Sequence, residues 1–90
     1  MKMQDILGIH TTAGENTERG NRAVREGRYL EALGFYSHAW GSYALVIALA
    51  KLYPHDEGLD RLSLESQTNI VDIKKKVECI GSSQDTLLMD

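Results

Sequence analysis

The stretch that decides the fold is residues 26–40, EGRYLEALGFYSHAW. Gly27 follows one helical pattern and precedes another, and a glycine just past the last helical residue commonly ends a helix. From Tyr29 onward, apolar residues recur at steps of three and four, which is the spacing of one helix face. The stretch therefore predicts two helices that run in opposite directions and are joined by a tight turn at Gly27 and Arg28.

The second of these helices is expected over residues 29–52, because Pro54 disfavours helical geometry at the residue before it. Two apolar stripes follow this helix, so we expect it to be central, with a neighbour on each side, and Trp40 to lie in the core or, otherwise, to mark an interface. The first stripe contains Ala32, Tyr36, Ala39, Tyr43, Val46 and Ala50, and the second contains Leu33, Trp40 and Ile47.

A preceding helix is expected over residues 12–26. Thr12 and Glu15 form a capping-box pattern, in which a hydroxyl and a carboxylate satisfy free amides at a helix start. The residues near one face of this helix are small, which allows a neighbouring helix to approach closely. Residues 1–11 form an N-terminal segment that either extends this helix or packs as a separate arm.

A third helix is expected over residues 59–80, with Gly81 ending it and residues 81–90 forming a C-terminal tail. Its apolar residues form a continuous seam of the coiled-coil type. The seam consists of Leu59, Leu62, Ser66, Ile70, Ile73, Val77 and Ile80.

Short loops make consecutive helices antiparallel. The predicted fold is therefore all-α, an antiparallel up-down-up three-helix bundle made of a helical hairpin and a third helix, with one domain over residues 12–80. A 90-residue chain with 42% hydrophobic residues has the size and composition of one small core.

The charge pattern and the single cysteine limit the functions to consider. The net charge is −3 without a long run of one sign, which argues against nucleic acid as a partner, because neutralising phosphates needs a basic field. Cys79 cannot form an internal disulfide, so a reducing, cytoplasmic setting is expected; its thiol is expected to be inert and partly buried. The longest apolar run, residues 43–50, is too short for direct membrane insertion.

No residue constellation points to catalysis. His10, His38 and His55 include no pair at the spacing that places two imidazoles on one metal, and no nucleophile elbow or phosphate-binding loop occurs. We therefore expect no enzyme activity, no metal and no cofactor. The one basic cluster, residues 74–76, is either a solvated helix face or an edge that attracts an acidic partner helix.

The pattern G-x-Y-x-E-A-L-x-x-Y-x-x-A at residues 27–39 resembles the helical hairpin of a tetratricopeptide repeat. In such a hairpin, a tyrosine covers the turn and alanines let two antiparallel helices approach. A repeat array needs several copies, and this chain has one. In addition, the apolar pattern of the second helix continues well beyond the length of such a repeat, to Leu52.

One such hairpin followed by a third, charged helix resembles the MIT (microtubule-interacting and trafficking) domain, over about residues 12–80. EGRYLEAL and YSHA match the turn signature of that family, and IVDIKKKVECI resembles its closing helix. Two other stretches have likenesses of their own. LSLESQ resembles an MIT-like domain of autophagy proteins, and YSHAWG is similar to the second helix of a family of small archaeal helical proteins.

The MIT resemblance implies binding. Such domains hold short helical or extended segments of ESCRT-III-type tails in grooves beside their third helix, and recruit a parent protein to membrane-trafficking assemblies at endosomal or autophagic membranes. The residues themselves show a second stripe on the third helix, at steps of four, three and four, that fits a helix-in-groove surface. This predicted peptide-binding stripe is Leu64, Thr68, Val71 and Lys75.

Two alternatives remain at this stage. The stripe residues could instead edge the core, without a binding role. The protein could also be a structural, homo-oligomerising helical protein, because residues 29–52 carry more apolar surface than the sparse first helix covers.

Overall fold

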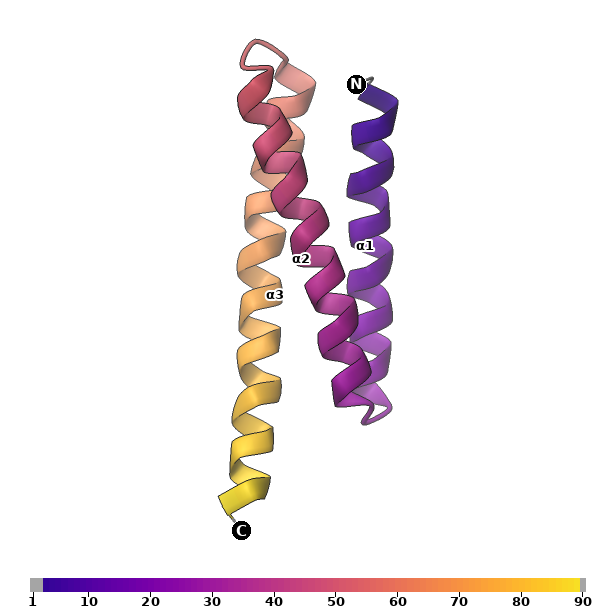
Figure 1. Ribbon diagram of the computed structural model, residues 1–90, viewed down its shortest axis with the longest axis vertical. Helices are drawn as coiled ribbons and strands as arrows, with labels where there is room; N and C mark the ends of the chain where they lie inside the picture. The colour runs from indigo at the N-terminus through magenta and orange to yellow at the C-terminus, as the bar shows by residue number, and fades with distance from the viewer. Residues whose placement is uncertain (1–2, 90) are drawn as a thin grey trace.

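The computed structural model describes the backbone of residues 3–89 and the side chains of residues 3–82. It confirms an all-α, up-down-up bundle of three helices: α1 (Met3–Arg25), α2 (Tyr29–Leu52) and α3 (Glu57–Met89). Figure 1 shows α2 crossing diagonally between α1 and α3, and the C-terminal end of α3 reaching past the turn that joins α1 to α2.

The turn between α1 and α2 is a Schellman motif centred on Gly27. Gly27 adopts φ +76°, which a glycine reaches without steric cost. The Gly27 amide donates to the Val24 carbonyl at 3.0 Å, and the Arg28 amide donates to the Ala23 carbonyl at 2.8 Å. These two bonds satisfy the last carbonyls of α1, which confirms the predicted end of the first helix.

The first helix begins earlier than its sequence signal suggested. It starts at Met3, so Thr12 lies inside the helix and the predicted capping box does not form. Ile6 is buried and packs with residues of α2 and α3. Burial of Ile6 therefore favours helix through the N-terminal segment, and this tertiary packing outweighs the local capping signal.

The third helix is longer than predicted at both ends. Its N-terminus is capped by Asp56, whose Oδ1 accepts a hydrogen bond from the Leu59 amide at 3.0 Å. At the other end, α3 continues to Met89 through the segment predicted as a tail. Among the described residues, Gly27 is the one glycine with a positive φ, so Gly81 does not adopt the geometry that ends a helix.

The core consists of two clusters along α2. We call the one beside the Gly27 turn the tyrosine cluster, and the one at the opposite end the aliphatic cluster. The tyrosine cluster contains Ala13, Ala23, Ala32, Tyr36, Ala39, Tyr43, Ile73 and Ile80. The aliphatic cluster contains Ile6, Val46, Leu49, Ala50, Leu59 and Leu62.

The first predicted stripe of α2 is buried along its whole length, and the α3 seam is buried or half-buried, as expected. Trp40 departs from the prediction, because its side chain is 37% exposed. The buried residues of α2 lie mainly on the first stripe, so the second stripe is left at the edge of the packed surface. Periodicity identified this second stripe but not how far the neighbouring helices would cover it.

Gly20 explains how closely α1 and α2 approach. A Cβ atom at this position would lie 2.5 Å from a ring carbon of Tyr36, closer than van der Waals contact allows. The absence of a side chain therefore makes room for the tyrosine ring against the α1 backbone. This contact confirms that small residues on the first helix bring its neighbour close.

Candidate peptide-binding groove

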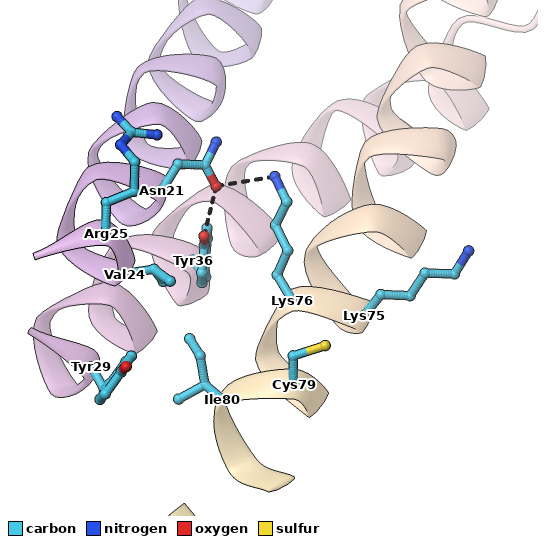
Figure 2. Close-up of a pocket in the computed structure, with 9 residues that line it drawn as sticks. All are labelled: Asn21, Val24, Arg25, Tyr29, Tyr36, Lys75, Lys76, Cys79 and Ile80. Carbon is cyan, nitrogen blue, oxygen red and sulfur yellow. Dashed lines mark hydrogen bonds between the residues drawn. The ribbon is translucent and has the colours of Figure 1, made fainter. Parts of the chain in front are cut away.

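A groove opens between α1 and α3 at the end near the Gly27 turn, with α2 as its floor (Figure 2). Its volume is about 450 Å³, within the range of about 300–1,000 Å³ typical of ligand sites. We call it the α1–α3 groove. It is lined by Asn21, Val24, Arg25, Tyr29, Tyr36, Lys75, Lys76, Cys79 and Ile80.

The groove exists because α1 and α3 both pack on α2 and make few contacts with each other. Small α1 side chains such as Ala23 sit on α2 and do not extend toward α3. Two polar contacts span the gap. Lys76 Nζ donates to Asn21 Oδ1 at 3.0 Å, and His10 Nε2 lies 3.6 Å from Glu65 Oε2.

Asn21 is the polar centre of the groove. Its Oδ1 accepts a hydrogen bond from the Tyr36 hydroxyl at 2.6 Å as well as the bond from Lys76, as the dashed lines in Figure 2 show. Lys76 Nζ also lies 3.3 Å from Asp72 Oδ2 and 6.0 Å from the centroid of the Tyr36 ring. One amide oxygen thus joins all three helices at the groove floor.

Burial raises the pKa of Tyr36 above its ordinary value. The carboxylates of Asp72 and Glu18 raise it further, and the Arg25 guanidinium opposes them. A tyrosine with an ordinary pKa is already protonated at neutral pH, and the raised pKa of Tyr36 extends its protonated range to higher pH. Tyr36 is therefore a fixed hydrogen-bond donor to Asn21, and not an anion facing the neighbouring cations.

Tyr43 continues the buried tyrosine row further along α2. Burial raises its pKa, while hydrogen bonds with the Thr17 and Asn69 side chains lower it and the Glu65 carboxylate raises it. The His10 ring meets the Tyr43 ring edge-on, with centroids 5.5 Å apart and planes inclined at 72°. Tyr36 and Tyr43 therefore both contact polar side chains of α1 and α3 along the gap between those helices.

The floor and the rim of the groove differ in chemistry. Val24, Tyr29 and Ile80 present apolar surface inside it. Cationic side chains lie beside it: Arg25 on the α1 side and Lys76 on the α3 side, whereas the ammonium group of Lys75 points away from the groove (Figure 2). This arrangement suits a ligand with an apolar group for the floor and negative charge for the rim.

Cys79 is exposed and lines the groove. The prediction of a partly buried thiol is wrong. The adjacent Ile80 belongs to the buried seam of α3, and one step along a helix turns the next side chain by about 100°. That turn moves Cys79 off the buried seam and into the lining of the groove.

The four residues of the predicted peptide-binding stripe, Leu64, Thr68, Val71 and Lys75, form one exposed row on α3. The side chains of Leu64 and Val71 are 65% and 53% exposed. Two shallow depressions follow this row, of about 400 Å³ beside Leu64 and Thr68 and about 300 Å³ beside Thr68, Val71 and Lys75. Lys75 also lines the α1–α3 groove, so the row leads into it.

Sequence reasoning identified Lys75 but missed the rest of the groove. Its lining comes from all three helices, and patterns within one helix do not show where separate helices diverge. The nearest signal was the basic cluster at residues 74–76, two of whose lysines line the groove.

Within the described part of the chain, no group of three or more His, Cys, Asp or Glu residues is placed to hold a metal ion. Among the helices as described, none combines the length and apolarity needed to cross a membrane. No protein-family model matches the chain, and no curated protein or solved structure shows significant similarity to it.

Proposed function

We propose that this protein is a peptide-binding module that holds a short segment of a partner protein in the α1–α3 groove. The observation that carries the proposal is the combination of an apolar floor with the cations Arg25 and Lys76 beside it, in a gap that the chain's own helices leave open (Figure 2). A peptide with a bulky apolar residue flanked by acidic residues complements both parts. The apolar residue would anchor on Val24 and Ile80, and the acidic flanks would meet the cations.

The exposed row on α3 provides a way to extend this contact. From Leu64 to Lys75, eleven residue steps correspond to about 16 Å along a helix. A partner segment of about three helical turns has that length. Such a segment would reach from the groove along Val71 and Thr68, consistent with helix-in-groove recognition.

The resemblance to MIT domains suggests a class of partner, the C-terminal tails of ESCRT-III-type proteins. In this proposal, the module recruits any parent protein to membrane-trafficking or autophagy assemblies, acting in the cytoplasm through its bound partner. The structure shares with MIT domains the architecture of a three-helix bundle. The partner class rests on the signature at residues 26–40 and awaits a binding measurement.

The test is a titration of fluorescently labelled peptides, read by anisotropy. The panel contains ESCRT-III C-terminal peptides and designed acidic amphipathic peptides with one apolar anchor. We expect Lys75→Glu and Cys79→Asp to weaken binding about tenfold, equivalent to about 1.4 kcal/mol, because each adds negative charge at the groove. Both positions are exposed, so the fold should tolerate the changes.

Lys74→Glu is the matched control, because Lys74 is exposed on the same helix but does not line the groove. We expect it to change affinity less than twofold. Leu64→Asp then reports whether the occupant extends along the row. If no peptide of the panel binds, or if the Lys74 and Lys75 variants lose affinity equally, the groove is not the binding site.

A further inference from the structure

Residues 85–90, DTLLMD, carry in this chain's own sequence the chemistry that the α1–α3 groove complements. The apolar residues 87–89 (Leu-Leu-Met) lie between Asp85 and Asp90. The groove has an apolar floor with cations beside it (Figure 2), so it suits an apolar group that is flanked by carboxylates. We call residues 85–90 the acidic–apolar segment.

The acidic–apolar segment follows shortly after the α3 residues that line the groove. Cys79 and Ile80 belong to this lining, and Ile80 lies at the end of the groove near the Gly27 turn, with Lys76 toward the other end (Figure 2). Four residues separate Ile80 from Asp85, and four residues are enough for a turn that reverses the chain. The segment can therefore enter the groove at Ile80 and run back between α1 and α3 toward Lys76.

The part of α3 that leads to this segment is weakly stabilised as a helix. Beyond Ile80, α3 continues past the Gly27 turn, where the ribbons of α1 and α2 have ended (Figure 1). Helical turns without packed neighbours are marginal in water, and residues 81–83 are Gly-Ser-Ser, which have low helix propensity. Unwinding this part of α3 therefore costs little, and burial of apolar surface in the groove can offset that cost.

We propose that the acidic–apolar segment is autoinhibitory: α3 unwinds at residues 81–84, and the segment folds back into the α1–α3 groove of its own chain. In this closed arrangement an apolar residue of the segment covers Val24 and Ile80 on the floor. Its carboxylates approach Arg25 and Lys76. A linker this short gives an effective concentration of about millimolar, so a contact with a millimolar dissociation constant is enough to compete with a partner peptide. The open arrangement of the structure then accepts the partner, so the inference rests on the proposed function and concerns regulation of the same site.

Cys79 reports whether the groove is closed, without the need for any partner. It is exposed, lines the groove and is the single cysteine of the chain. The test is its rate of alkylation by iodoacetamide in the full chain, followed by mass spectrometry. We expect Leu87→Ser/Leu88→Ser to react severalfold faster than the wild type, because the change removes the apolar anchor and adds no charge near the thiol.

Leu52→Ser is the matched control for loss of a leucine. Leu52 is 70% exposed and lies at the end of α2 away from the groove. This variant should therefore react at the wild-type rate.

A second pair of variants tests the unwinding step. Gly81→Ala favours the continuous helix, and an added Cβ at Gly81 meets nothing within 4 Å. This variant should also react faster than the wild type. Gly41→Ala is its control, because Gly41 is an equally open helical glycine on α2, and its rate should be unchanged.

Equal alkylation rates of the wild type and Leu87→Ser/Leu88→Ser would overturn the inference and leave the proposed function standing. Protection of Cys79 that grows with protein concentration would also overturn it, because the segment would then occupy the groove of a second chain. If Cys79 is protected in the wild type but no peptide of the panel binds Leu87→Ser/Leu88→Ser, the inference holds and the proposed function fails. If both hold, this variant should bind a peptide of the panel severalfold more tightly than the wild type does.

Discussion

The tyrosine cluster and the aliphatic cluster involve the same three helices but fill the space between them differently. Near the Gly27 turn, α1 supplies small residues, and two tyrosines of α2 fill the interior and end in hydrogen bonds. At the other end, α1 supplies Ile6, which packs with branched side chains of α2 and α3.

The difference shows why the groove lies where it does. At the aliphatic end, Ile6 of α1 packs in one cluster with Leu59 and Leu62 of α3, and Met3 approaches Gly58. At the tyrosine end, α1 and α3 are joined across the gap by the bond between Asn21 and Lys76. A polar link of this kind leaves apolar floor exposed beside it, and that floor is the α1–α3 groove.

Leu59→Ala should have the largest effect, because it removes a fully buried side chain from the aliphatic cluster. A substitution of this kind costs about 2–5 kcal/mol through lost burial and the cavity left behind. Urea denaturation followed by circular dichroism would measure it. The groove lies at the other end of the bundle, so under conditions where the variant is folded its peptide affinity should be unchanged. A loss of stability below about 1 kcal/mol would mean that the aliphatic cluster is loosely packed.

Gly20→Ala tests the tyrosine cluster and should have the next largest effect. The new Cβ would collide with the Tyr36 ring, and overpacking of a core costs about 1–3 kcal/mol. The control is Gly8→Ala, where the added Cβ meets nothing. It should stabilise the protein by up to about 1 kcal/mol through helix propensity. Opposite signs in thermal or urea unfolding would confirm the close contact, and equal effects would contradict it.

Alkaline pH should destabilise the tyrosine cluster and not the aliphatic cluster. The loss of stability should be smaller than that caused by Leu59→Ala or Gly20→Ala. Tyr36 and Tyr43 have pKa values raised above the ordinary value of 10.0, so the folded state favours their protonated forms. Their contribution to stability is complete below pH 10.0 and is lost as the pH rises from there through their pKa values in the folded state.

The measurement compares urea unfolding of the wild type and Tyr36→Phe/Tyr43→Phe from neutral pH to above the ordinary tyrosine pKa. The double variant starts from a different stability, so the informative quantity is the slope against pH. The wild type should lose stability more steeply in the alkaline range. Parallel slopes would show that the two hydroxyls ionise in the fold as readily as in the unfolded chain.

Local signals predicted the hairpin well. The turn at Gly27 and the buried stripe of α2 are each determined by residues close together in the chain. Both appear in the structure as expected. The sequence left two starts open for α1, at the capping pattern near Thr12 or through residues 1–11, because the start depends on Ile6 packing against distant residues.

The groove and the position of Trp40 depend on how far neighbouring helices extend over a surface. Periodicity gives the direction in which a side chain points along its own helix but not the distance to the next helix. For that reason Lys75 could be identified from sequence, whereas the juxtaposition of Asn21, Tyr36 and Cys79 could not.

The sparse contact between α1 and α3 also affects how the chain reaches its fold. Since most tertiary contacts join helices that are consecutive in sequence, little chain entropy is lost in closing long loops before contacts form. Helical proteins with such local topologies fold on the order of microseconds to milliseconds. The α1–α2 hairpin, closed by the Gly27 turn, is therefore expected to fold early, with α3 docking onto it afterwards.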